Sequence, residues 1–264
     1  MLLPQGREVI VLRQYNLEII ENCQSCQNRP ERLFCDLSPE ALQAFDAIKC
    51  TTAYPQSAVL FVEGQVPSGI FLVCKGTVKL SACSHAGKVL LVRLAKPGEI
   101  LGLSAVLSNS PYELTAVTAE PCQVNFVKRH AYLRFLRQYP EACLKVTQQL
   151  SERYRLACQE LRWLGLVRTA EQRLAKLLLD WSHGTCEDQP ANYVELTLTQ
   201  EEIAQLIGTT RETVTRVMGD FKRRNILELA DSTLIIRNRP ELSGIAAQTT
   251  YNKDNHEPRN GKSV

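Results

Sequence analysis

Residues 196–227 read LTLTQEEIAQLIGTTRETVTRVMGDFKRRNIL, a pattern that predicts two short helices joined by a tight turn. Thr199 precedes Glu202 at the spacing of a capping box, which starts the first helix. Gly208 supplies the backbone freedom that a sharp turn between helices needs. Thr210 can cap the second helix. The apolar residues of this second helix recur at helical spacing and predict its buried face, which is Val214, Val217, Met218 and Phe221.

The outward face of the second helix carries Arg211, Glu212, Thr215 and Arg216 near its N-terminal half. Arginine pairs with guanine and glutamate accepts from cytosine in the major groove, where such helices present their N-terminal side chains. The alternative is a helical hairpin of an unrelated core with solvated charges outside. The candidate DNA-binding residues are Thr199, Gln200, Thr210, Arg211, Glu212, Thr213, Thr215, Arg216 and Lys222.

Residues 226–229 (ILEL) and 233–236 (TLII) are β-rich runs on either side of a polar Ala230-Asp231-Ser232 turn, which predicts a β-hairpin. A helix-turn-helix followed by a hairpin is a winged arrangement. We interpret this part of the chain as the output end of the protein.

Composition sets broad limits on the whole chain. Its 264 residues suffice for two domains, and 44% hydrophobic content is ordinary for a soluble protein. A formal charge of +3 is weak, so any DNA affinity must come from the placement of charges. We find no apolar run long enough to span a bilayer, and charges at 7, 8, 13, 18 and 21 interrupt any signal-peptide core. The sequence therefore predicts a cytoplasmic protein, whose ten cysteines indicate free thiols, metal or redox chemistry.

Residues 54–127 have a different character, with short β-rich runs separated by glycines. Such spacing predicts a sandwich or a small barrel. The predicted strands are 59–62, 70–73, 77–80, 89–92 and 124–127. Ser38 is expected to cap a short helix that precedes them.

The periodicity becomes helical from residue 131 to 166, where an apolar stripe recurs at spacings of three and four. The stripe is Val146, Leu150, Tyr154, Ala157, Leu161 and Leu164. It predicts a seam between two identical subunits, although packing onto the chain's own β-domain is the alternative. A second capping box at 169–172 opens a further helix that Gly184 closes, and 193–196 is expected to be a strand. The polar tail beyond Pro240 is expected to be disordered.

This order of parts resembles the CRP/FNR superfamily of bacterial transcription regulators over residues 35 to 240. Residues 210–216, TRETVTR, look like the recognition helix of the cyclic-AMP receptor protein branch, where the matching Arg, Glu and Arg read the operator half-site. The glycine-punctuated runs 54–64, 70–76 and 97–102 are similar to the family's β-roll. The resemblance implies a homodimer on a pseudo-palindromic operator in double-stranded DNA, and RNA polymerase as a partner if the protein is an activator.

The fold class implied is α+β: an N-terminal β-roll (a double-stranded β-helix like cyclic-nucleotide-binding domains), a long dimerisation helix and a C-terminal winged helix-turn-helix. The expected boundaries are a cysteine-containing segment at 1–38, the sensor domain at 39–130, the dimerisation helix at 131–166, the DNA-binding domain at 167–240 and the disordered tail at 241–264.

The positions that hold a cyclic nucleotide in the family differ in this chain. The Gly-Glu pair that holds the ribose is Gly102-Leu103, and the region of the phosphate-binding Arg-Ser pair reads Tyr112-Glu113-Leu114-Thr115, with no arginine. Leucine cannot accept from a ribose hydroxyl, and Glu113 would repel a phosphate. The sequence therefore argues against cyclic AMP as the effector.

A redox signal is the other input that the resemblance implies. Cys23, Cys26 and Cys35 precede the β-roll, and Cys122 resembles the fourth cluster ligand of the FNR branch. Four thiolates suit an iron–sulfur cluster or, less favoured, zinc. The spacing from Cys26 to Cys35 is longer than the usual oxygen-sensor pattern. The alternative is a vestigial loop with buried thiols.

Two other classes of protein compete with a DNA-binding regulator. An enzyme is disfavoured because the four histidines lie in unrelated contexts and no phosphate-cradling GxxxxGK loop is present. No catalytic residue is predicted. The remaining alternative is a ligand- or protein-binding module whose helix-turn-helix is structural.

Overall fold

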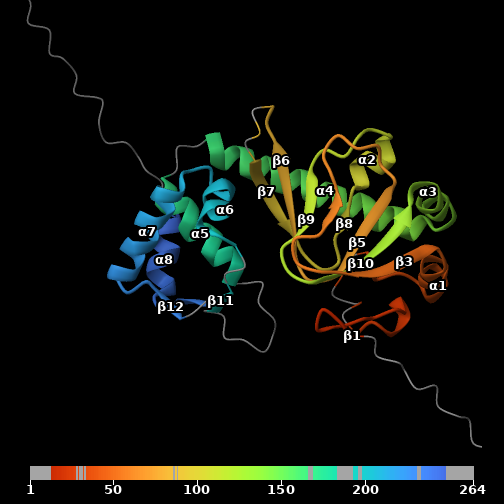
Figure 1. Ribbon diagram of the computed structural model, residues 1–264, viewed down its shortest axis with the longest axis horizontal. Helices are drawn as coiled ribbons and strands as arrows, with labels where there is room; N and C mark the ends of the chain where they lie inside the picture. Colours follow the sequence, from red (N-terminus) through yellow and green to blue (C-terminus); the bar gives the residue numbers. More distant parts are fainter. Residues whose placement is uncertain are drawn as a thin grey trace, which may run out of the picture. The chain divides into compact units, whose positions relative to one another are not determined.

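The computed structural model describes residues 13–27, 29, 32, 34–85, 87, 89–165, 169–182, 193–195, 198–230 and 233–247. The chain divides into two compact units, Met1–Ala157 and Cys158–Val264, whose elements are labelled in Figure 1. Among the described helices, none combines the length and the apolar character needed to traverse a bilayer.

The first unit contains two four-stranded antiparallel sheets, ordered β3-β10-β5-β8 and β4-β9-β6-β7. In chain order, its elements are β1 (Arg13–Gln14), β2 (Leu17–Glu18), the 3-10 helix η1 (Cys23–Ser25), α1 (Pro39–Ile48), β3 (Lys49–Tyr54), β4 (Val59–Phe61), β5 (Gly69–Lys75), β6 (Val78–Cys83), β7 (Val89–Ala95), β8 (Ile100–Leu101), α2 (Leu103–Ser108), β9 (Thr115–Thr118), β10 (Cys122–Lys128), α3 (Arg129–Gln138) and the first part of α4 (Pro140–Gly165). The predicted β-rich fold of this region is confirmed, and the sequence pattern missed β3, β8, β9 and α2. Ser38 caps α1 as predicted, accepting from the Ala41 N–H at 3.3 Å.

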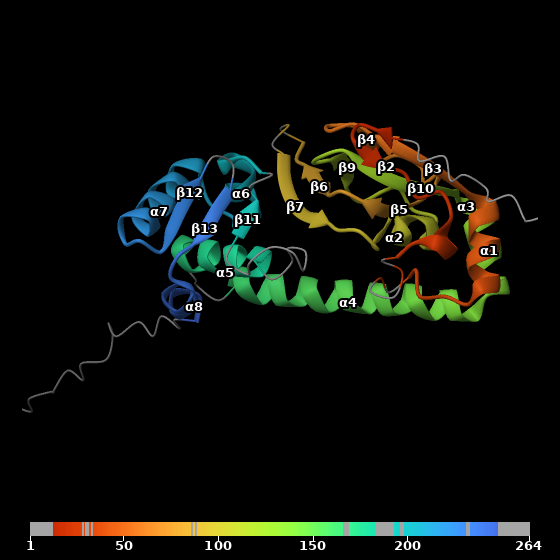
Figure 2. The same cartoon turned by 90° about the horizontal axis from the view of Figure 1, so that it is seen from below.

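The sheet β3-β10-β5-β8 forms the middle layer of this unit. Side chains alternate along a strand, so Val73 and Val124 face the other sheet, whereas Leu72 and Val127 face the helices. One core cluster therefore lies between the sheets, and a second lies under α1, α3 and the start of α4. Figure 2 shows α1 and α3 beside this sheet. The two clusters are separated by a single layer of strands.

The long helix predicted over 131–166 is two helices in the structure, α3 and α4, so that prediction was wrong at the break. Tyr139 leaves the helical conformation with φ −121° and ψ 88°, and α4 begins at Pro140. Proline has no backbone N–H and disfavours a helical conformation in the preceding residue. A proline at a helix start is well tolerated, because the N–H it lacks would have no partner there. The long helix is therefore α4 alone.

The predicted apolar stripe of α4 divides between two environments. Val146 is buried at 2% exposure and Leu150 packs against the same cluster, as the alternative interpretation required. Tyr154 and Leu161 are 75% and 67% exposed, as a free seam would be. The side chain of Leu164 lies outside the described residues. The stripe is therefore not one continuous surface.

The second unit contains the winged helix-turn-helix that the sequence predicts. Its elements after α4 are α5 (Ala170–Ser182), β11 (Tyr193–Glu195), α6 (Gln200–Leu206), α7 (Arg211–Arg223), β12 (Leu227–Ala230), β13 (Thr233–Ile236) and α8 (Arg239–Ala247). The hairpin β12–β13 and the strand β11 form one antiparallel sheet ordered β11-β13-β12. The capping box of α5 is present, with Thr169 and Gln172 bonded to each other's backbone N–H at 3.2 and 3.1 Å. Gly184 lies outside the described residues.

The segment after Pro240 is not disordered throughout, and the prediction of a tail from residue 241 was wrong over the length of α8. Ile245 and Ala246 follow Leu242 by three and four residues, so the three side chains share one face of a helix. They are buried at 0 to 8% exposure, and α8 lies against α5. Residues 248–264 lie outside the described part of the chain. The DNA-binding unit therefore extends past residue 240.

Candidate functional site

The helix-turn-helix is held in shape by its own polar residues. The Glu202 N–H donates to Thr199 Oγ1 at 3.2 Å, and the Thr199 N–H donates to Glu202 Oε2 at 2.9 Å, completing the predicted capping box of α6. Gly208 adopts a φ of +62° in the turn, which glycine does without steric cost. Thr210 then caps α7 by accepting from the Thr213 N–H at 3.3 Å. These contacts fix the start of each helix and the turn between them.

The recognition helix α7 has one buried face and one open face. Val214, Val217, Met218 and Phe221 are 0 to 5% exposed, as predicted. The opposite face, near the N-terminus, is exposed and slightly hollowed, and its lining residues are Arg211, Glu212, Thr215 and Arg216. The structure thus brings the predicted reading residues together on one accessible surface.

Thr215 connects the two helices of the motif. Its hydroxyl oxygen Oγ1 lies 2.6 Å from Gln200 Oε1 and 3.0 Å from the Arg211 carbonyl oxygen, and its hydroxyl group can donate to either. Gln200 is the first residue of α6, so its amide nitrogen is presented beside the reading face. Thr199, Gln200, Thr210 and Lys222 are all exposed, and Thr213 is half-buried.

Glu212 is held in its anionic form. Hydrogen bonds from its own backbone N–H and from the Thr210 side chain lower the pKa of its carboxyl group. An ionised carboxylate is an acceptor only, which is the form that can accept from a cytosine amino group.

The arginine that follows α7 joins three helices of the second unit. Arg224, at the end of α7, contacts Glu171, Asp220 and Glu241 at 2.9, 3.4 and 2.8 Å, and so connects α5, α7 and α8. These ion pairs give Arg224 a structural role in the second unit. Lys222 lies two residues earlier on exposed surface.

We expect Thr199→Ala to destabilise the second unit by about 1 kcal/mol, because it removes the capping acceptor at the start of α6. The midpoint of thermal unfolding should fall by about 4–8 °C if this unit unfolds independently. Thr199→Ser keeps the hydroxyl oxygen and should restore the midpoint. Differential scanning calorimetry of both variants measures this, and equal midpoints for the alanine variant and the parent would contradict the capping role.

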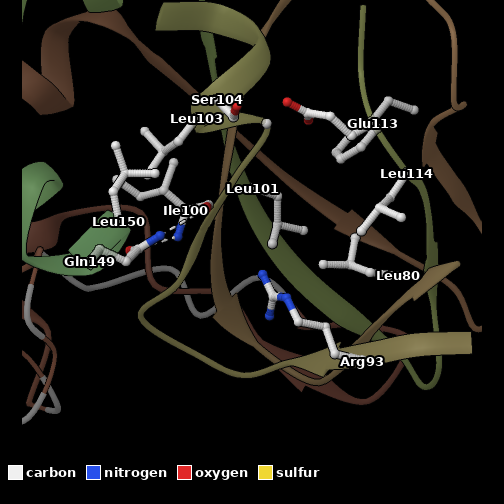
Figure 3. Close-up of a pocket in the computed structure, with 12 residues that line it drawn as sticks. Leu80, Arg93, Ile100, Leu101, Leu103, Ser104, Glu113, Leu114, Gln149 and Leu150 are labelled. Atoms are coloured by element: carbon white, nitrogen blue, oxygen red, sulfur yellow. Dashed lines mark hydrogen bonds between the residues drawn. The ribbon is translucent and has the colours of Figure 1, made fainter. Parts of the chain in front are cut away.

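The β-roll contains a partly open cavity of about 140 Å³. Its lining residues are Phe61, Leu80, Arg93, Ile100, Leu101, Gly102, Leu103, Ser104, Glu113, Leu114, Gln149 and Leu150. Figure 3 shows Arg93 and Glu113 at opposite sides of the cavity, with leucines between them. The two positions that the sequence singled out, Leu103 and Glu113, both line it.

Helix α4 closes one side of this cavity through contacts that the sequence did not reveal. Gln149 Nε2 donates to the Ile100 carbonyl at 2.9 Å, and the Ile100 N–H donates to Gln149 Oε1 at 3.2 Å. One turn on, Arg153 forms an ion pair with Glu99, which also binds Arg93 at 2.8 Å. These contacts could have been predicted, because Gln149 and Arg153 are four residues apart and lie on the same helical face as the apolar Val146.

The four cysteines predicted to bind metal do not lie on one side of the fold. Cys35 is buried in the cluster under the helices, and Cys23 packs against that cluster. Cys122 is buried in the cluster between the sheets, where its Sγ lies 3.3 Å from the Thr77 carbonyl. Because side chains alternate along β10, Cys122 points away from the face where Asn125 lies 3.9 Å from Cys23 Sγ.

The residues present therefore do not fit the predicted metal set of Cys23, Cys26, Cys35 and Cys122. Among the described residues, no group of three or more His, Cys, Asp or Glu side chains is arranged to hold a metal ion. Cys74, rather than Cys122, packs against the same cluster as Cys23 and Cys35. Lys49 donates to Cys23 Sγ at 3.0 Å and pairs with Asp46 at 2.5 Å.

Burial makes several of these thiols poor nucleophiles, because only the thiolate reacts. Desolvation raises the pKa of Cys35, Cys74 and Cys122 from 9.0 to about 12, and that of Cys23 to about 11 despite the nearby Lys49. By contrast, Cys50, Cys83 and Cys143 are exposed.

We expect iodoacetamide at pH 8 to modify Cys50, Cys83 and Cys143 before Cys35, Cys74 and Cys122. A pKa of about 12 in place of 9.0 lowers the thiolate fraction by about 1000-fold. Timed alkylation followed by peptide mass spectrometry measures the order, with unfolded protein as the control in which the differences disappear. Modification of Cys35 as fast as Cys50 in the folded protein would contradict it.

Two family models match the chain. A model of the cyclic nucleotide-binding domain matches residues 51–139, and a model of the Crp-like helix-turn-helix domain matches residues 172–245. The "Cyclic AMP receptor protein" of Thermus thermophilus is 28% identical over 81% of this chain and 96% of that protein. The "CRP-like cAMP-activated global transcriptional regulator" of Mycobacterium tuberculosis is 26% identical over 80% of this chain and 94% of that protein.

Solved structures share the fold. FixK2 from Bradyrhizobium japonicum superposes with a TM-score of 0.68 at 22% identity, covering 76% of this chain and 98% of that one. A CooA mutant from Carboxydothermus hydrogenoformans gives a TM-score of 0.63 at 22% identity, over 76% of this chain and 89% of that one. The chain therefore shares its fold with these solved structures.

Proposed function

Because the chain belongs to the CRP/FNR family of transcription regulators, with a cyclic nucleotide-binding domain and a Crp-like helix-turn-helix, we propose that it binds a pseudo-palindromic operator in double-stranded DNA as a homodimer. The observation that carries the proposal is the open face of α7, where Arg211, Glu212 and Arg216 share one accessible surface. A signal at the β-roll controls this binding. The named relatives are transcription regulators, which supports a role without catalysis.

The residues on the open face of α7 have different roles in recognising the bases. Arg211 and Arg216 contact guanines, and Glu212 accepts from a cytosine. Thr199, Gln200, Thr210, Thr213 and Lys222, together with Thr215, contribute donors at the edge of this face. Donors of this kind bind phosphate oxygens and fix the register of the protein on the duplex.

The subunits associate through the face of α4 that points away from the β-roll. Leu144, Thr147, Ser151, Tyr154, Cys158 and Leu161 follow spacings of three and four, the pattern of a coiled-coil seam. Leu144, Tyr154 and Leu161 are 58%, 75% and 67% exposed. Val146, Gln149 and Arg153 lie on the opposite face, toward the roll. The same helix can therefore bind a second copy without leaving its own β-roll.

The residues of the β-roll disfavour cyclic AMP as the effector. Leu103 stands where a ribose acceptor is needed and is 4% exposed, so its side chain cannot be replaced by ligand without repacking. Glu113 lines the same cavity, and its negative charge would repel a phosphate. The names of the relatives from T. thermophilus and M. tuberculosis refer to cyclic AMP for those proteins.

Operator selection from random duplex DNA, followed by gel-shift titration, tests the proposed function. We expect two inverted half-sites about 10 base pairs apart from centre to centre, since two recognition helices must enter successive major grooves about 34 Å apart. Affinity should fall steeply with salt, as counterions are released from phosphates. Recovery of no preferred sequence would favour a module whose helix-turn-helix is structural.

A further inference from the structure

Four cysteines, which we call the thiol group, meet on the helix-facing side of the sheet β3-β10-β5-β8. Cys35 is buried in the core cluster under the helices, and Cys23 and Cys74 pack against that cluster. Cys26 follows η1, and its N–H donates to the Cys23 carbonyl oxygen at 3.4 Å. Besides burial, which is the main cause, negative charge at Cys23 and Cys26 raises the pKa of Cys35, and negative charge at Cys23 and Cys35 raises the pKa of Cys74. Cys35 therefore lies within electrostatic range of the other three thiols.

Backbone hydrogen bonds keep the first three of these cysteines together. The Arg29 N–H donates to the Cys26 carbonyl oxygen at 3.2 Å, and the Arg32 N–H donates to the Arg29 carbonyl oxygen at 3.2 Å. The Cys35 N–H then donates to the Arg32 carbonyl oxygen at 2.9 Å. The chain from Cys26 to Cys35 therefore advances in turns, so these cysteines can contact one bound group although their separation in the sequence is long.

The sheet positions the two remaining members of the thiol group. Cys74 follows Leu72 by two residues on β5, so its side chain also faces the helices. Gln123 of β10 is fully buried, accepts from the Ile20 N–H at 2.9 Å and donates to the Ile20 carbonyl oxygen at 2.6 Å. The segment that leads to Cys23 is thus bound to β10, the neighbour of β5 in the sheet.

Two cations lie beside the thiol group. Lys49 Nζ lies 3.0 Å from Cys23 Sγ, and the Lys49 side chain is only 4% exposed, where it also pairs with Asp46 at 2.5 Å. Against the larger effect of burial, the charges of Arg32 and Lys49 lower the pKa of Cys35. Thiolates that bind a metal group carry net negative charge, and buried charge requires opposite charge nearby. The surroundings of the thiols meet this requirement.

The arrangement favours an iron–sulfur cluster over a single metal ion. Four thiolates suit either one. A single zinc ion needs every sulfur about 2.3 Å from one point, and among the residues that the structure describes no such convergence of three or more ligands occurs. In a cluster of four irons each thiolate binds a different iron, so the sulfurs remain farther apart.

We propose that the thiol group binds an iron–sulfur cluster, whose ligands are Cys23, Cys26, Cys35 and Cys74. Cys74 replaces Cys122, which faces the core between the two sheets. The site goes beyond the proposed function, because neither base recognition by α7 nor subunit contact through α4 requires a metal.

Anaerobic reconstitution of the full chain with ferrous iron, sulfide and a thiol reductant tests the inference. After desalting, we expect about four irons and four acid-labile sulfides per chain, together with visible absorption from sulfur-to-iron charge transfer. A colourless protein without iron and sulfide, or iron retained without sulfide, overturns the proposal.

Two serine variants identify the fourth ligand. Cys74→Ser should lower the iron and sulfide content at least about tenfold after desalting, whereas Cys122→Ser, the matched change of a buried thiol on the other side of the sheet, should keep the content and the spectrum of the parent. Circular dichroism of both variants before reconstitution controls for folding. Retention of the cluster in folded Cys74→Ser, or its loss in folded Cys122→Ser, overturns the assignment.

Alkylation of the parent protein tests the site without any variant. Cys26 is only partly buried and Cys50 is exposed. In the reconstituted protein, iodoacetamide should modify Cys26 at least about tenfold more slowly than in the metal-free protein, because a bound thiolate is not free to react, while Cys50 should react equally in both. Equal modification of Cys26 in both forms overturns the proposal. These measurements need no DNA, so a failed operator selection alongside a stable cluster refutes the proposed function alone.

Discussion

Arg211→Ala is expected to weaken operator binding by about 1–3 kcal/mol per half-site and to remove the preference at one base pair of each half-site. Arg211 is the first residue of α7 and lies on its exposed face, where a guanidinium can meet O6 and N7 of a guanine. Both half-sites of a dimer lose the contact, so the total loss is about twice the single value if the half-sites act independently. Gel-shift titration against operators with each base at each position measures both quantities.

A nearby arginine supplies the control. Arg223 is on the same helix but pairs with Asp220 at 3.1 Å and lies in the last turn. Arg223→Ala should leave base preferences unchanged and alter affinity for all sequences alike, since a contact to phosphate carries no base information. A uniform loss in Arg211→Ala, without relaxation at one position, would show that Arg211 contacts only the DNA backbone.

Tyr154→Glu combined with Leu161→Glu is expected to convert the protein to a monomer and to lower operator affinity by about 10²- to 10⁴-fold. Among the described side chains of α4, Tyr154 and Leu161 are the most exposed large apolar ones, and carboxylates at both would face each other across a two-fold seam. A monomer loses the high effective concentration that the second DNA-binding unit contributes. Light scattering after size exclusion gives the mass, and gel shift gives the affinity.

Gln159→Glu is the matched control for the seam. Gln159 is exposed on α4 but lies off the spacing of Leu144, Tyr154 and Leu161, so one added carboxylate there should leave the mass and the affinity unchanged. A dimeric double variant with normal DNA binding would place the subunit contact elsewhere.

The parts of the fold that the sequence predicted correctly are those encoded by local signals. The capping residues Thr199 and Thr210, the turn at Gly208 and the buried stripe of α7 depend on residues within four positions of one another, and all are present. Five strands of the β-roll, β4, β5, β6, β7 and β10, were predicted from β-rich runs between glycines, whereas β3, β8 and β9 were missed. The exposed face of α7 followed directly, because the buried face of a helix determines the opposite one.

The incorrect predictions depend on contacts between distant segments. The side of the sheet on which Cys122 lies is set by the register of β10 against β3 and β5, and no local pattern contains that register. Similarly, the stripe of α4 was assigned to one partner, whereas Val146 packs on the roll and Leu161 remains exposed. The turn at Tyr139 had a visible local cause in Pro140, which the apolar periodicity obscured.

The contacts of Arg224 determine where the chain can be cut to give a stable DNA-binding unit. Arg224 connects α7 to Glu171 of α5 and to Glu241 of α8, and Leu242 of α8 is fully buried. A shortened protein or a chimaera joined at Pro240 would remove one of the three carboxylates around Arg224 and expose apolar surface of α5. The natural boundary for exchanging this domain with that of a relative is therefore after Ala247.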